Sequence, residues 1–159
     1  MTIPQTVTVY LAVVDAPKAI DFYKAAFGAE ELMRFDMPDG TICHAELKIG
    51  DSIVYLAEEN VEWQNPGPKA LGGTSVRICL EVDDVDSLTE TAVAAGAEIL
   101  MPLEDQFFGF RQGRLGDPFG HQWVVSTNTE NLTTEEMQQR FEEMMAAGGG
   151  DCESQNGGE

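Results

Sequence analysis

The feature that most constrains the fold of this chain is an internal repeat. The six residues GAEELM that begin at Gly28 recur as GAEILM from Gly96. Each copy follows, at the same distance, an apolar run that ends in aspartate, at Asp15 and at Asp83. Self-similarity of this kind indicates that one structural unit is used twice. The chain is therefore expected to consist of two halves built on one plan.

Each half is predicted to contain one strand, one helix and three further strands. A β-rich run opens each half, and a segment with helical periodicity follows it and ends at Gly28 or Gly96. Both helices carry an apolar stripe, which we expect to lie on a sheet. The predicted strands are residues 7–14, 30–37, 41–49 and 52–58 in the first half, and 75–82, 98–101, 107–115 and 121–127 in the second, with a long connection after residue 101.

This pattern predicts an α+β fold of two paired βαβββ modules with a C-terminal amphipathic helix. A segment rich in proline and glycine separates the modules. We expect a single domain over residues 1–147, composed of module 1 (6–58), a linker (59–73), module 2 (74–128) and a terminal helix (133–147), followed by a disordered tail (148–159).

The terminal helix is predicted from a capping box and an apolar stripe. Thr133 is followed three residues later by Glu136, and Met137, Phe141 and Met144 recur at helical spacing. A methionine-rich stripe of this kind is typical of a core element or of a dimer seam. Another alternative is a non-catalytic interaction domain whose terminal helix binds a partner.

The charge of the chain argues against two classes of partner, nucleic acids and anionic membranes. The 159 residues carry a formal net charge of -19 at pH 7, which repels nucleic acid and anionic membranes.

No apolar run approaches the roughly 18 residues that cross a bilayer, and the N-terminus lacks the features of a secretory signal. Cys43, Cys79 and Cys152 contain no Cys-x-x-Cys pair, which argues against a disulfide framework and a zinc ribbon. We therefore predict a cytoplasmic protein with no nucleic-acid or membrane partner.

Several motifs resemble those of a known family. They are AIDFYKAAFGAE from Ala19, HAEL from His44, DQFFG from Asp105 and DPFGH from Asp117. Together with the paired modules, these segments are similar to the vicinal oxygen chelate superfamily of glyoxalases, bleomycin-resistance proteins and dioxygenases. Within it the likeness is to the PhnB-like, or glyoxalase-like, group. The resemblance implies a curved, eight-stranded cup around a central cavity, and a homodimer.

The resemblance also implies where a metal would be held. In metal-dependent members, His and Glu ligands lie on the first and last strands of each module. The corresponding positions in this chain are Thr8, Tyr55, Arg77 and Val124. None of these residue types is a good ligand for a divalent cation, since such sites need imidazole nitrogen or carboxylate oxygen. We therefore predict no metal at the usual site.

The residues expected to face the cavity are aromatic and polar. Because strand side chains alternate in direction, one parity of each strand is assigned to this face. The predicted ligand-binding residues are Thr8, Tyr10, His44, Glu46, Tyr55, Arg77 and Gln122. Such a lining is typical of a small-molecule pocket, and no catalytic residue is assigned.

Three of these residues decide between the alternatives. A buried Arg77 needs a carboxylate partner, for which Glu46 is the candidate, or an anionic ligand. His44 and Glu46 share a strand face, so they form a hydrogen-bonded pair or, in a lesser alternative, hold a divalent metal. The main hypothesis is that the protein binds a small organic molecule without the family's usual metal. An anionic molecule would suit Arg77. The alternative is a lyase, isomerase or dioxygenase-type enzyme with a non-standard or metal-free site.

The other histidine, His121, follows the turn Asp117-Pro118-Phe119-Gly120. Proline and glycine in this order favour a tight turn, which sets the register of the last strand. We predict that His121 is structural and that its ring has a backbone partner.

Overall fold

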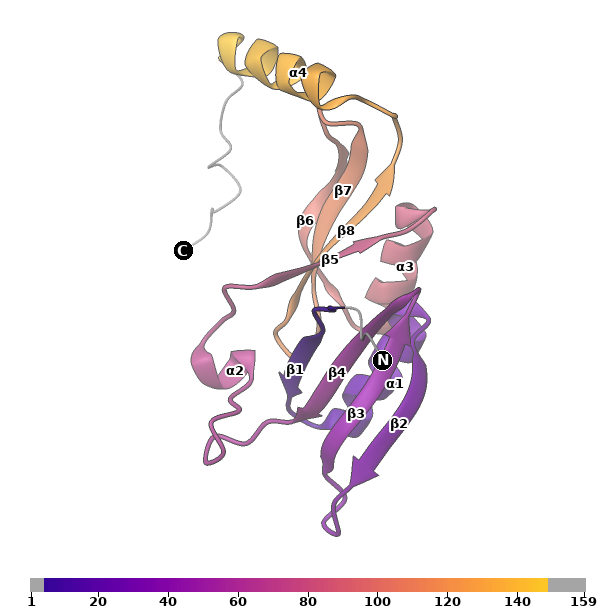
Figure 1. Cartoon of the computed structure of the whole chain (residues 1–159), viewed down its shortest axis with the longest axis vertical. Helices are drawn as coiled ribbons and strands as arrows, with labels where there is room; N and C mark the ends of the chain where they lie inside the picture. Colours follow the sequence, from indigo (N-terminus) through magenta and orange to yellow (C-terminus); the bar gives the residue numbers. More distant parts are fainter. Residues whose placement is uncertain (1–4, 149–159) are drawn as a thin grey trace.

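The computed structural model describes residues 5–148 and shows two βαβββ modules followed by a C-terminal helix (Figure 1). The predicted α+β fold of paired modules is confirmed. The predicted tail, apart from Gly148, lies outside the described residues. In the described part of the chain, no helix combines the length and the apolar character needed to cross a membrane.

Module 1 is a four-stranded sheet with one helix on one face. Its elements are β1 (Val9–Val13), α1 (Ala16–Phe27), β2 (Glu30–Asp36), β3 (Ile42–Ile49) and β4 (Ser52–Glu58). The strand order is β1-β4-β3-β2, with β1 parallel to β4 and the other pairs antiparallel. Glu58, at the end of β4, accepts hydrogen bonds from the amides of Asp15 and Ala16 at 2.6 and 2.8 Å. These bonds satisfy amides at the start of α1 that have no partner within the helix.

Module 2 repeats the same topology. Its elements are β5 (Arg77–Glu81), α3 (Val85–Ala95), β6 (Glu98–Asp105), β7 (Phe110–Gly116) and β8 (Gln122–Asn128). The strand order is β5-β8-β7-β6, which matches module 1 strand for strand. Asp84 caps α3 through the amide of Ser87, and Gly96 ends it with a positive φ of 117°. The repeat seen in the sequence is therefore a repeat of structure.

The two modules meet through their helices, while their strands stay in two separate sheets. α1 packs against α3, and a single core includes Tyr23 of α1 and Trp123 of β8, whose ring centroids are 5.7 Å apart. On β5 the partly buried Ile78 and Leu80 alternate with exposed residues of the other parity. Each sheet therefore covers the core with one face and leaves the other as an open, cup-like surface (Figure 1).

The turn before β8 joins the modules. The buried carboxylate of Asp117 accepts hydrogen bonds from the Tyr23 hydroxyl at 2.7 Å, the Trp123 indole at 3.0 Å and the amides of Phe119 and His121. The ring Nε2 of His121 lies 3.0 Å from the carbonyl oxygen of Ala12 in β1. His121 has the backbone partner that the sequence predicted, and the turn links α1 and β1 to module 2.

Strand β6 is longer than the sequence predicted. The expected long connection after Met101 is wrong, because the strand continues through Pro102 to Asp105. Proline lacks an amide hydrogen and is tolerated at sheet edges and irregularities. β6 is the edge strand of its sheet, and its register with β7 shifts on both sides of Met101.

The linker and the C-terminal segment contain two further helices. The short α2 (Pro68–Leu71) lies within the linker and was not predicted. The predicted terminal helix is present as α4 (Thr134–Ala146), with both hydrogen bonds of the capping box between Thr133 and Glu136. No residue of α4 is buried, and Figure 1 shows the helix beyond the end of module 2. The alternative that its methionine stripe belongs to the core is therefore wrong.

Candidate functional site

The predicted ligand-binding residues divide between the open faces of the two sheets. Module 1 carries five of them and module 2 carries two. Thr8 directly precedes β1, and Tyr10, His44, Glu46 and Tyr55 lie on β1, β3 and β4, whereas Arg77 and Gln122 are register partners on β5 and β8. The structure therefore does not bring all seven residues into one site within a single chain.

Four residues of module 1 contact one another. We call Tyr10, His44, Glu46 and Tyr55 the Tyr10 cluster. The hydroxyl oxygen of Tyr10 lies 2.7 Å from Nδ1 of His44, and Nε2 of His44 lies 3.5 Å from Oε1 of Glu46. The Tyr55 ring packs edge-on against both neighbours, at 5.7 Å from the Tyr10 ring and 5.1 Å from the His44 ring. Tyr55 thus holds the two interacting rings in place.

Two places in the chain are candidate sites for a metal ion: the superfamily's usual ligand positions and the pair His44 and Glu46. At the positions that correspond to the superfamily's metal ligands, the side chains are those of Thr8, Tyr55, Arg77 and Val124, which offer no imidazole or carboxylate. In residues 5–148, no group of three or more His, Cys, Asp and Glu side chains is placed to hold a metal ion. The ring nitrogens of His44 are already engaged by Tyr10 and Glu46. The four side chains at the usual ligand positions therefore do not offer a divalent metal the donors that it prefers.

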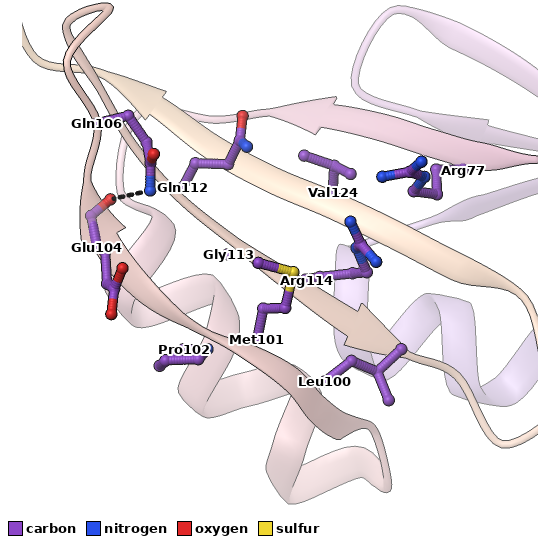
Figure 2. A pocket seen from close by; sticks show the side chains of 10 residues that line it. All are labelled: Arg77, Leu100, Met101, Pro102, Glu104, Gln106, Gln112, Gly113, Arg114 and Val124. Carbon is purple, nitrogen blue, oxygen red and sulfur yellow. Dashed lines mark hydrogen bonds between the residues drawn. The ribbon is translucent and has the colours of Figure 1, made fainter. Parts of the chain in front are cut away.

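The open face of module 2 holds a cavity of about 420 Å³ (Figure 2). Its size is within the range of small-molecule pockets. We call it the arginine pocket. It is lined by Arg77, Leu100, Met101, Pro102, Glu104, Gln106, Gln112, Gly113, Arg114 and Val124. Figure 2 shows both guanidinium groups toward one end of the pocket and Glu104 at the other.

Two cations therefore lie together at one end of this pocket without an ion-paired carboxylate, and the one carboxylate of the lining, Glu104, lies at the other end. Among residues 5–148, Arg34, Arg111 and Arg140 form ion pairs, whereas Arg77 and Arg114 form none. Nε of Arg114 is buried without a hydrogen-bond partner. Burial, and then the positive charge of Arg77, lowers the pKa of Arg114. The two positive charges repel each other, and an anion bound beside them would reduce this repulsion.

The sequence prediction included Arg77 but missed Arg114. The ion pair expected between Arg77 and Glu46 does not form, since Glu46 lies beside His44 in the other module. A signal for Arg114 was present: in the antiparallel pair of β7 and β8, Arg114 is the register partner of Val124, which the alternation had assigned to the cavity face. Arg111, of opposite parity, instead binds Asp86 at 2.8 Å on the helix side.

Paired βαβββ modules, each with an open sheet face, define the class of vicinal oxygen chelate folds. A family model described as the Glyoxalase/Bleomycin resistance protein/Dioxygenase superfamily matches residues 2–125. The chain belongs to this superfamily.

Known relatives agree with this membership. An uncharacterized protein of Mycobacterium tuberculosis is 42% identical over 132 residues, which cover 81% of this chain and 78% of the relative. The crystal structure of TioX from Micromonospora sp. ML1 is 33% identical, covers 81% of this chain and all of TioX, and has a TM-score of 0.60. The fosfomycin resistance protein FosX from Listeria monocytogenes shares the fold, at 22% identity and a TM-score of 0.62 over 86% of this chain and 99% of FosX.

Proposed function

We propose that this protein binds a small anionic organic molecule in the arginine pocket. The observation that carries the proposal is the adjacency of Arg77 and Arg114 without a carboxylate partner in the described part of a chain that has 28 Asp and Glu residues. The two neighbouring guanidinium groups repel each other, and the partial burial of Arg114 adds to the cost of its charge. A carboxylate or phosphonate group would relieve both costs through charge-assisted hydrogen bonds.

The rest of the pocket suits an organic body attached to the anion. Leu100, Met101 and Val124 supply apolar surface, and the side-chain amides of Gln106 and Gln112 can donate or accept hydrogen bonds. Half of the ten lining residues are polar or charged, Glu104 among them, so polar contacts would orient the ligand while the apolar side chains hold its body. Binding of this kind needs no metal, since the guanidinium groups meet the ligand's charge.

The proposal is tested by titrating benzoate and phenylphosphonate, with neutral benzamide as the uncharged probe, by calorimetry. We expect the two anions to bind and benzamide to bind at least tenfold more weakly. Arg77→Gln and Arg114→Gln are each expected to weaken anion binding by about 10- to 100-fold, as the loss of a charge-assisted hydrogen bond of 1.5–3 kcal/mol implies.

The matched control is Arg34→Gln, which removes the same charge from an ion pair with Glu31 and Asp36 in module 1. It is expected to leave the affinity unchanged. Equal binding of benzamide and benzoate, or wild-type affinity in both pocket variants, would contradict the proposal. Prior dialysis against EDTA is expected to have no effect, and a loss of affinity would indicate a metal.

We further propose that two copies of the chain complete the cup. Within one chain the open faces belong to separate sheets, and both expose large apolar side chains: Phe35 is 58% exposed on module 1, and Leu100 is 40% exposed on module 2. Two copies related by a twofold axis could cover both faces reciprocally, because each copy offers module 1 to the partner's module 2. The PhnB-like assignment and the cytoplasmic location remain predictions.

Light scattering coupled to size exclusion tests the dimer. The wild-type protein is expected to elute with the mass of two chains at micromolar concentration, and Phe35→Asp with the mass of one, because a carboxylate is costly to bury in an interface. Val61→Asp, at a linker position that is 64% exposed, is the control and is expected to remain a dimer. A wild-type monomer would disprove this part of the proposal.

A further inference from the structure

The Tyr10 cluster has the arrangement of an activated hydroxyl group. Burial, and secondarily the nearby Cys43, raises the pKa of Tyr10, so its hydroxyl keeps its proton at neutral pH. Because the Glu46 carboxylate can only accept, its contact with Nε2 favours the tautomer of His44 in which the Tyr10 hydroxyl donates the 2.7 Å hydrogen bond to Nδ1. Nε2 of His44 then carries the ring proton and points it toward Glu46, 3.5 Å away. A hydroxyl, a base and a carboxylate follow one another in that order.

Tyr10 is also accessible to a ligand. Tyr10 is 50% exposed on the open face of module 1, whereas Tyr23, in the core, is fully buried. Tyr10 also lines a cavity of about 290 Å³ between β1 and the linker segment that contains α2. None of the residues that line this cavity is an aspartate, glutamate, lysine or arginine. A ligand held there would be uncharged, in contrast to the anion expected in the arginine pocket.

We propose that Tyr10 is a base-activated nucleophile toward small, uncharged acyl compounds, with His44 as the base and Glu46 as a positioning residue. A weak nucleophile gains reactivity when a base lies within hydrogen-bond reach and a third group orients that base. In the step, the phenol oxygen bonds to the acyl carbonyl carbon, and the bond from that carbon to the leaving group breaks. The phenol proton passes to Nδ1 of His44 and then to the leaving group.

The proposal does not depend on the arginine pocket. It uses the side chains of module 1, and no step passes through Arg77, Arg114 or a metal. Anion binding can therefore fail while this reactivity holds, and the reverse is equally true.

The test measures the acetylation rate of individual tyrosines by N-acetylimidazole, an uncharged acyl donor, with peptide mass spectrometry. The chain contains three tyrosines, so each site can be followed separately. His44→Gln is expected to slow acetylation of Tyr10 at least tenfold. Glu46→Gln is expected to slow it about twofold to fivefold, with Glu46→Asp restoring most of the rate.

Tyr55 is the internal control. Its ring contacts the His44 ring at 5.1 Å, but no hydrogen bond joins its hydroxyl to His44 in the described structure. A general change of packing or exposure in the variants would alter the rates of Tyr10 and Tyr55 together. The proposal requires Tyr10 alone to respond. An unchanged Tyr10 rate in His44→Gln, or a parallel fall at both tyrosines, would overturn it.

Discussion

Replacing Asp117 with alanine is expected to lower the free energy of unfolding by about 3–5 kcal/mol. The substitution leaves the Tyr23 hydroxyl and the Trp123 indole, both fully buried, without their acceptor, and each buried unsatisfied donor costs about 1–3 kcal/mol. It also removes the acceptor for two amides of the turn before β8. Urea unfolding followed by tryptophan fluorescence measures the change.

Module 1 offers the matched control for this substitution. Asp39 lies in the turn between β2 and β3 and accepts hydrogen bonds from the amide and hydroxyl of Thr41, but this turn is exposed to solvent. Asp39→Ala is expected to cost less than about 1 kcal/mol, because water replaces the lost acceptor. If the two alanine variants lost equal stability, Asp117 would be no more than an ordinary turn residue.

The second large effect is a loss of stability at alkaline pH that depends on Tyr23. Burial, followed by the Asp117 carboxylate, raises the pKa of Tyr23 well above its usual value. The unfolded chain therefore releases this proton near pH 10 while the folded chain retains it. Stability is complete below pH 10 and declines above it, by about 1.4 kcal/mol per pH unit for this group, until the folded pKa is reached.

Comparison of the wild type with Tyr23→Phe isolates this contribution. The variant is expected to be less stable at neutral pH, since Asp117 loses a donor, but its stability should fall less steeply above pH 10. Other groups, including Tyr10, titrate in both proteins and cancel in the difference. Urea unfolding at pH 8, 10 and 11 provides the measurement, and parallel curves for the two proteins would contradict the assignment.

Both effects depend on the same contact between the modules. Tyr23 belongs to α1 of module 1, and Asp117 and Trp123 belong to module 2. The hydrogen bond from His121 to the carbonyl oxygen of Ala12 adds a second link at the same turn. The turn sequence DPFG therefore does more than reverse the chain: it positions one module on the other. The orientation of the two open faces depends on this link.

The local structure was largely predictable from the sequence. Gly28 and Gly96 end their helices and Thr133 caps the terminal helix, because each acts on backbone groups a few residues away. Strand alternation also assigned Tyr10 and Arg77 to the face opposite the core residues of their strands. The predicted end of the strand at Met101 was wrong, because Pro102 is tolerated within β6. It is tolerated because β6 lies at the edge of its sheet, a position that depends on the order of the other strands.

The sequence by itself determined two βαβββ modules, their turns and the facing of most strand residues, since periodicity, capping and turn chemistry are local properties. Tertiary structure alone decided which residues form a site. It placed Arg114 beside Arg77 and separated both from Glu46, and it brought Tyr10 within 2.7 Å of His44, which is 34 positions away in the chain. Contacts between distant strands depend on sheet order and on how the modules pack, which side-chain alternation within one strand does not specify.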